Sequence, residues 1–212
     1  MARNVAAGIV LALLVVTSGC VGFLSGPVSF SASAATVNDA ALEQTGYEHN
    51  RTRDLTVTRN FSVAGQSKRV EVTNKLSEYH RSVGVPGVGE RRVAAFVTFA
   101  SPQVDVLGQS FNPLSKYDNR QLAEQFTAQL KSVGNLRKVG EREATMLGKT
   151  TTVTKFEATV TTVGGLEFDA NVHVTKVKHG DDYVVAIAVH PKRLSGHQSK
   201  VDTLIEGVEH EQ

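Results

Sequence analysis

Residues 150–189, TTTVTKFEATVTTVGGLEFDANVHVTKVKHGDDYVVAIAV, contain three segments rich in Val and Thr, separated by two short turns. In the middle segment, residues 166–175, apolar and polar side chains alternate, which is the period of a strand with one packed face and one polar face. The residues at 164–165 and 179–182 are typical of hairpin turns. Because hairpin links join antiparallel strands, this segment predicts a three-stranded β-meander.

The first half of the chain shows the same kind of pattern. Residues 55–63 and 70–76 alternate on either side of a turn at 64–66, and they predict a hairpin. Residues 93–100 and 183–189 are nearly all apolar. Such segments predict central strands that are covered on both faces.

Three segments carry helix signals. A short helix is expected at 39–45, with Asn38 as its N-cap. The strongest helix begins after Asp118, with Gln121 three residues later as in a capping box. A final helix is expected at about 195–208.

Gly134 follows the apolar stripe of the strongest helix and is expected to be its C-cap. After it we expect a short strand at 136–140 and a turn near 141–144. The two meanders and two main helices together predict an α+β fold. In that fold an antiparallel sheet of two meanders carries two main helices, within a single domain at 36–212.

The start of the chain has the features of an exported protein. Arg3 supplies a positive n-region, residues 5–16 are apolar, and small or polar residues lead to Cys20. A Cys in this position is typical of a lipobox, so residues 1–19 are expected to be a lipoprotein signal peptide and Cys20 to be lipidated. Residues 20–35 are rich in Gly, Ser and Ala and are expected to form a flexible tether.

Other interpretations of the start of the chain stay open. Cleavage near the alanines at 32–35 would release a soluble protein. An uncleaved span at 5–24 would be about long enough to cross a bilayer. Within the expected tether, Val28 and Phe30 could pack against the folded body.

Composition excludes some classes of protein. Arg3 is the only charged residue in the expected signal peptide, residues 1–19. Without that segment, 22 of the 23 Lys and Arg residues remain, against 21 Asp and Glu. A nearly neutral chain lacks the basic excess that a nucleic-acid partner requires. With Cys20 as the only cysteine, no internal disulfide can form. The sequence has no Gly-rich phosphate loop, so no cofactor is expected.

Several short, separated segments resemble a family of haloarchaeal envelope lipoproteins known only as a domain of unknown function. These segments are 34–42, 45–47, 70–74, 111–113, 152–156, 179–182 and 209–211. The resemblance implies attachment to the cell envelope and supplies no activity. The second half also resembles the PsbP-type fold, an antiparallel sheet with helices on it, and this likeness carries no function.

Polar clusters offer candidate sites, each with a simpler interpretation. Residues 179–182 could bind a cation, but Gly and Asp are typical of a hairpin turn. His173, Asp169 and Asn171 share one face of a strand, where a solvated face is expected because a metal needs three or four converging ligands. Residues 79–81 could form a polar pocket or simply end a strand. No metal site is therefore predicted.

Two triplets match the N-glycosylation sequon. They begin at Asn50 and Asn60, and export would make both usable in principle.

The function expected is a lipid-anchored binding or structural module on the outer face of the cell membrane. Its partner would be an unknown envelope protein or ligand. The expected contact surface is formed by the loops at 84–89 and 111–117, with Phe111, Leu114 and Tyr117 as apolar contacts. An envelope hydrolase, with its site assembled from distant segments, and an accessory subunit of a transporter are the alternatives. A deep pocket with several perturbed carboxylates or histidines would favour the hydrolase.

Overall fold

A computed structural model describes residues 27–63, 66–87, 89–106, 108–129, 133–161, 165 and 167–211. The expected signal peptide, Cys20, the first part of the expected tether and Gly164 of the expected hairpin turn lie outside the described residues. Within the described ranges, no helix combines the length and the apolar character needed to span a membrane.

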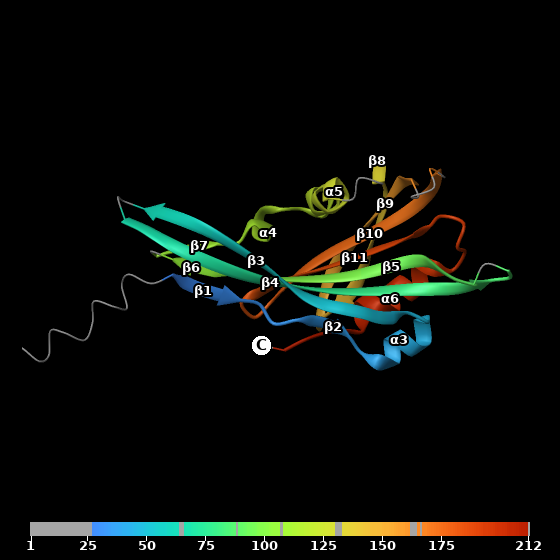
Figure 1. Cartoon of the computed structure of the whole chain (residues 1–212), viewed down its shortest axis with the longest axis horizontal. Helices are drawn as coiled ribbons and strands as arrows, with labels where there is room; N and C mark the ends of the chain where they lie inside the picture. The colour runs from blue at the N-terminus through green and yellow to red at the C-terminus, as the bar shows by residue number, and fades with distance from the viewer. Residues whose placement is uncertain are drawn as a thin grey trace, which may run out of the picture.

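The described part of the chain is built mainly from long strands (Figure 1). In chain order, the elements are β1 (Val28–Ser31), β2 (Ala35–Val37), α3 (Asp39–Thr45), β3 (Glu48–Val63), β4 (Gln66–Val85), β5 (Gly89–Pro102), β6 (Val104–Val106), β7 (Gln109–Phe111), α4 (Pro113–Lys116), α5 (Asn119–Gln129), β8 (Val133–Met146), β9 (Lys149–Thr161), β10 (Glu167–His179), β11 (Asp182–Pro191), α6 (His197–Glu206) and β12 (Val208–His210).

Two antiparallel meanders form the main sheet. One contains β3, β4 and β5, the other contains β8 to β11, and an antiparallel β5–β11 pair joins them. The order is β1-β4-β5-β11-β10-β9-β8, with β3 also paired to β4. β1 is parallel to β4 and occupies the part of its edge that β5 does not reach, which makes the sheet mixed.

The expected α+β class is wrong. Among the described residues, the chain is mostly β, with a large mixed eight-stranded sheet and four small helices. The two expected main helices are too short to form a layer of the fold, because α5 and α6 are only 11 and 10 residues long. The cores therefore consist mainly of side chains from strands.

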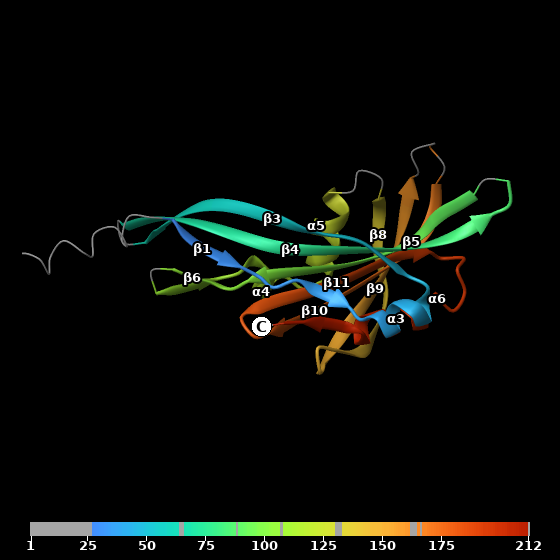
Figure 2. The ribbon, with the colours of Figure 1, turned by 60° about the horizontal axis from the view of Figure 1, so that its bottom comes forward.

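The two faces of the sheet are covered differently (Figures 1 and 2). On one face, α3, α6 and the small β2–β12 sheet pack over Val184, Ala186 and Ala188 of β11. On the other face, α5 packs over a second core that includes Val185 and Ile187 of the same strand. This two-sided packing explains why β11 is apolar at nearly every position, and it confirms the expected central strand at 183–189.

Helix α5 covers only part of its face. It contacts β8, β9 and β10. A helix is about 10–12 Å wide with its side chains, and neighbouring strands are about 4.8 Å apart, so one helix covers two or three strands. The same face of β4, β5 and β11 is therefore left without a helix over it.

The region around the expected C-cap differs from the prediction. Helix α5 ends at Gln129, and Gly134 lies in β8 instead of capping a helix. No turn interrupts β8 at 141–144. The reversal comes at Leu147 and Gly148, both with positive φ, as a type I′ hairpin turn requires.

The helix expected at 39–45 is confirmed as α3. The side chain of Asn38 accepts a hydrogen bond from the backbone N–H of Ala41 at 2.9 Å, and Gly46 ends the helix at φ 70°. The final helix is shorter than expected, because Val208 leaves it and enters β12, which pairs with β2. Residues 28–31, placed by the sequence within the tether, form β1, and Phe30 packs against Val70 and its neighbours.

Candidate functional site

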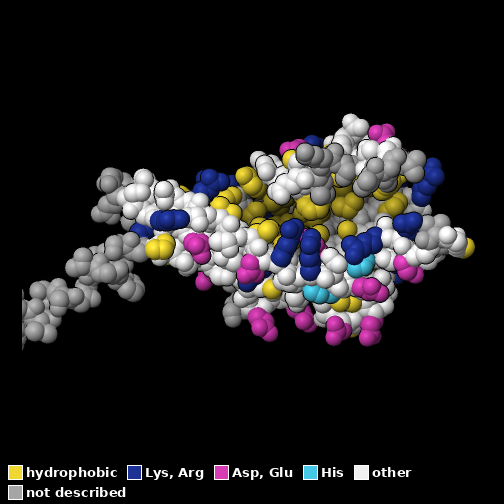
Figure 3. Space-filling model, in the orientation of Figure 1, with side chains coloured by type: hydrophobic (Ala, Val, Ile, Leu, Met, Phe, Trp, Pro, Cys, Tyr) yellow, Lys and Arg dark blue, Asp and Glu magenta, His cyan; other side chains and the backbone are white. Residues whose placement is uncertain are grey.

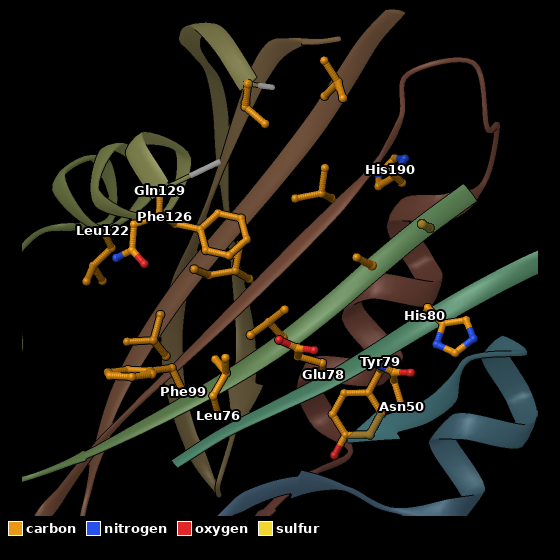
Figure 4. Close-up of a pocket in the computed structure, with 18 of the residues that line it drawn as sticks. Asn50, Leu76, Glu78, Tyr79, His80, Phe99, Leu122, Phe126, Gln129 and His190 are labelled. Atoms are coloured by element: carbon orange, nitrogen blue, oxygen red, sulfur yellow. The ribbon is translucent and has the colours of Figure 1, made fainter. Parts of the chain in front are cut away.

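An apolar groove of about 840 Å³ lies between α5 and the uncovered strands. Figure 3 shows hydrophobic side chains exposed in this hollow, with Lys and Arg side chains along its lower edge. The floor includes Val97 and Phe99 of β5 and Ile187 of β11, and Leu122 and Phe126 of α5 form one wall (Figure 4). We call this feature the apolar groove.

Polar side chains gather at the edge of the groove formed by β3, β4 and β5. They are Asn50 and Arg53 from β3, Glu78 and His80 from β4, and Arg92 from β5. These residues are distant in the sequence, and strand register brings them together. We call this set the polar rim.

Glu78 is the carboxylate of the polar rim, and it is already engaged. Its Oε2 accepts a hydrogen bond from Nε of Arg51 at 2.6 Å, and its Oε1 lies 3.0 Å from Nη2 of Arg53. The hydrogen bond from Arg51 lowers the pKa of Glu78, against the opposing effect of partial burial. Glu78 is therefore a paired anion at neutral pH.

Arg92 and His80 retain free hydrogen-bonding capacity. Arg92 donates one long hydrogen bond of 3.4 Å to Oδ1 of Asn50, and within the described residues it has no ion pair. His80 lies 3.9 Å from the mostly exposed carboxylate of Glu48 through Nε2. Its Nδ1 is buried and has no hydrogen-bond partner among the described residues. Buried polar atoms are normally hydrogen-bonded, so this nitrogen marks an incomplete site.

The far end of the groove contains two of the three contact residues expected from sequence. Leu114 and Tyr117 line the groove beside Phe99. The ammonium group of Lys176 donates to the backbone carbonyl oxygens of both residues, at 2.5 and 2.6 Å, and so fixes α4 and the residue after it to β10. Phe111 is not in the groove. It packs against Phe61 with ring centroids 4.9 Å apart.

A second polar feature lies on the opposite face of the sheet, beneath α6. Three buried histidines, each 1–3 % exposed, form a line in which His190 contacts both of the others, His173 and His197. We call them the histidine row. Nε2 of His173 lies 3.2 Å from Nε2 of His190, and the rings of His190 and His197 are 4.5 Å apart. The expectation of a solvated face at His173 and Asn171 is therefore wrong, because both side chains are buried.

The hydrogen bonds of the histidine row assign its protons. The carbonyl oxygen of Pro191 can only accept, so Nδ1 of His190 donates to it at 3.0 Å. In a neutral ring, Nε2 of His190 is then an acceptor, and Nε2 of His173 donates to it. Nδ1 of His173 in turn accepts from Nη1 of Arg142 at 3.0 Å. Every assigned bond is satisfied only when His173 and His190 are neutral.

Burial favours the same neutral forms. It lowers the pKa of His173 to about 2, with a contribution from Arg142, and it lowers the pKa of His197 to about 4, with a contribution from His190. Nε2 of His197 contacts the hydroxyl of Tyr47 at 2.8 Å. No group of three His, Cys, Asp or Glu side chains suited to a metal occurs in the described ranges.

The residues of the expected turn at 179–182 have a structural role. His179 pairs with Asp182 across the turn, where Gly180 has φ 58°, so the turn interpretation is confirmed. Oδ2 of Asp182 accepts hydrogen bonds from the backbone N–H of Ser33 at 2.9 Å and from Nε2 of His210 at 3.0 Å. This carboxylate therefore joins the segments at the two ends of the described chain.

The two sequon asparagines lie on β3. Both residues are exposed, and Asn50 also belongs to the polar rim. Sequence reasoning did not find the apolar groove, the polar rim or the histidine row. The signal at 79–81 pointed to a polar pocket, and His80 does line the groove. No local pattern, however, relates it to Arg92 or to α5.

The chain matches none of the curated proteins with which it was compared. A family model described as a domain of unknown function, DUF6517, matches residues 34–209, which include the groove and the histidine row. The chain therefore belongs to the DUF6517 family.

Proposed function

We propose that this chain is a lipid-anchored binding module of the cell envelope, and that its apolar groove holds a chain-like apolar ligand. The observation that carries the proposal is the uncovered floor beside α5. Small-molecule sites are commonly concave, largely apolar and about 300–1,000 Å³ in volume, and the groove of about 840 Å³ falls within that range.

The floor of the groove supports an elongated ligand. Ala95 of β5 is exposed, and it faces His80 on one side and Val189 on the other. Phe168 of β10, which also lines the groove, is 37 % exposed. Covering such surface with an apolar chain contributes about 0.8 kcal/mol for each methylene buried.

The residues of the lining favour binding over covalent catalysis. Among the described residues that line the groove, none is a Ser, Thr, Cys or Lys. His190 also lines it, but both of its ring nitrogens are engaged, with His173 and with the carbonyl of Pro191. An envelope hydrolase is the alternative left open by sequence. It would therefore need a nucleophile other than a Ser, Thr, Cys or Lys side chain of the described lining or His190.

Membrane attachment through Cys20 is part of the same proposal. The signal-peptide pattern and the resemblance to haloarchaeal envelope lipoproteins support it. A tethered protein near the membrane surface meets apolar and amphiphilic molecules, which fits the groove. The likeness of the second half to the PsbP-type fold adds only an antiparallel sheet with helices on it.

The test blocks the groove without disturbing a core. Ala95→Phe places a large ring on the exposed floor, and Ala40→Phe makes the same change on the exposed surface of α3, on the opposite face. The full-length protein is titrated with Nile red, a neutral apolar dye. Ala95→Phe is expected to weaken dye binding by about tenfold or more, and Ala40→Phe is expected to bind like the parent protein.

Two results would contradict the proposal. One is a parent protein that does not bind the dye. The other is equal binding by the parent and by Ala95→Phe, which would assign the dye to a different surface. Circular dichroism of all three proteins verifies that each is folded.

A further inference from the structure

We infer that the ligand of the apolar groove is an amphiphile with an anionic head group, which the polar rim binds through Arg92. The inference rests on the proposed function and adds a head-group chemistry and an orientation to it. Three observations carry it: the balance of charge at the rim, the unused donors there, and the contrast between the two ends of the groove.

The polar rim has an excess of positive charge. Arg53 and Arg92 of the rim provide two guanidinium groups beside the carboxylate of Glu78, and Arg51, next to the rim, provides a third. Glu78 engages Arg51 and Arg53, which leaves Arg92 without an ion pair in the described structure. The other nearby carboxylate, Glu48, is mostly exposed and 3.9 Å from His80. An anion at this edge is therefore complementary to Arg92.

Unused hydrogen-bonding groups point to the same place. The guanidinium of Arg92 has five N–H donors, of which one bond, to Asn50, is present at 3.4 Å. Nδ1 of His80 is buried without a partner. Since Nδ1 of His80 has no exposed surface, the group that a ligand can reach is Arg92, whose guanidinium is suited to donate two parallel bonds to a carboxylate or phosphate.

The opposite end of the groove is apolar. Leu114, Tyr117 and Phe99 line it, and the carbonyl oxygens of Leu114 and Tyr117 are turned away to Lys176. Figure 4 shows the same contrast, with Phe99 and Leu76 at one end of the view and His80 and Asn50 at the other. A bound amphiphile would therefore place its head group at Arg92 and its chain toward Tyr117.

The test compares ligands that share one tail. Nile red bound to the full-length protein is displaced with palmitate, hexadecanol or hexadecyltrimethylammonium, all below their micelle concentrations. Acetate tests whether the head group alone is sufficient. Palmitate is expected to displace the dye at the lowest concentration and acetate to have no effect.

Two arginine variants assign the preference to the rim. Arg92→Gln is expected to reduce the preference for palmitate over hexadecanol by about two- to fivefold, because an exposed ion pair is worth up to about 1 kcal/mol. Its affinity for hexadecanol is expected to fall less than its affinity for palmitate, because the alcohol carries no charge to pair with the guanidinium. The control is Arg69→Gln, an exposed arginine of β4. Successive side chains of a strand point to opposite faces, so Arg69 lies on the other face of β4 from Val70. This variant is expected to keep the full preference for palmitate.

The outcomes separate this inference from the proposed function. Equal displacement by palmitate and hexadecanol, or a preference for the cationic amphiphile, would overturn the anionic head group and leave the apolar groove standing. A preference for palmitate that Arg92→Gln does not change would overturn the role of the rim. If no amphiphile displaces the dye and Ala95→Phe has no effect, the proposed function itself fails.

Discussion

Nε2 of His173 lies 3.2 Å from Nε2 of His190, and both rings are buried and nearly parallel. Two imidazoles can share this contact only if one nitrogen carries a proton and the other does not. Protonation of His190 would put two N–H groups against each other. Arg142, which also donates to His173, adds a positive charge that opposes protonation of the row.

The first prediction is a loss of stability in mild acid. Folding lowers the pKa of His173 from 6.5 to about 2, and that of His197 from 6.5 to about 4. Below pH 6.5 the unfolded chain binds protons that the folded chain does not, so the free energy of unfolding falls as pH falls. Each histidine that stays neutral contributes a slope of about 1.4 kcal/mol per pH unit. Urea denaturation at stepwise lower pH, from neutral to about 4, measures this slope.

A variant assigns the acid sensitivity to the row. His173→Gln is expected to be less stable at neutral pH but to show a slope smaller by about 1.4 kcal/mol per pH unit. His49→Gln, at an exposed position of β3, is the matched control and is expected to keep the parent slope. If His173→Gln retains the parent slope, the sensitivity has another source.

The second prediction concerns the junction at Asp182. Its Oδ2 accepts from both Ser33 and His210, and an amide oxygen in its place would lack the negative charge that strengthens these two bonds. Asp182→Asn is therefore expected to lower the free energy of unfolding by about 1–3 kcal/mol. Asp181→Asn, at the exposed neighbour in the same turn, is expected to change it by less than about 0.5 kcal/mol. Thermal unfolding measures both, and equal losses would contradict the assigned role.

The third prediction concerns the contact between α3 and the end of α6. A Cβ atom at Gly207 would lie 2.5 Å from Cβ of Ala41, which is closer than two carbons can approach. Gly207→Ala is therefore expected to be destabilised by about 1–3 kcal/mol, because a helix must shift to make room. The control is Gly140→Ala in β8, where a Cβ meets open space and where Ala is expected to be neutral or slightly stabilising. Chemical denaturation compares the two, and a parent-like Gly207→Ala would show that α3 and α6 are not closely packed.

The fourth prediction tests the membrane anchor. If Cys20 is lipidated, the intact mass of the protein extracted from membranes is expected to lack residues 1–19 and to include the added lipid. Cys20→Ser is expected to remove the lipid and to shift the protein out of the membrane fraction. A mass equal to the unmodified 212-residue chain would contradict lipidation.

Much of the local structure could be predicted from short patterns. Asn38 and Gly46 bound α3, and Asp118 and Gln121 form the capping box that begins α5, with bonds of 2.8 and 3.0 Å. These signals are reliable because a cap acts on neighbouring backbone groups only. The end of α5 differs from the prediction, because Gly134 does not cap the helix and instead lies in a strand that pairs with β9.

The candidate site could not be predicted in the same way. Leu114 and Tyr117 were expected at a contact surface from their apolar character in an irregular segment, and both line the groove. Arg92 and His80 come from different strands and meet α5 residues such as Phe126 only across the groove. Their proximity depends on strand order and on how far one short helix extends over the sheet.

The amino-acid sequence alone determined the hairpin of the first meander, the strands and the 179–182 turn of the second, and the two nearly continuous apolar strands, since alternation and turn chemistry act over a few residues. Tertiary structure decided the class of the fold, the uncovered face beside α5 and the burial of three histidines. The physical reason is the separation along the chain of the residues that interact. A strand's pattern reports that a face is buried or exposed, but which element covers that face depends on contacts between residues such as Tyr47 and His197, 150 positions apart.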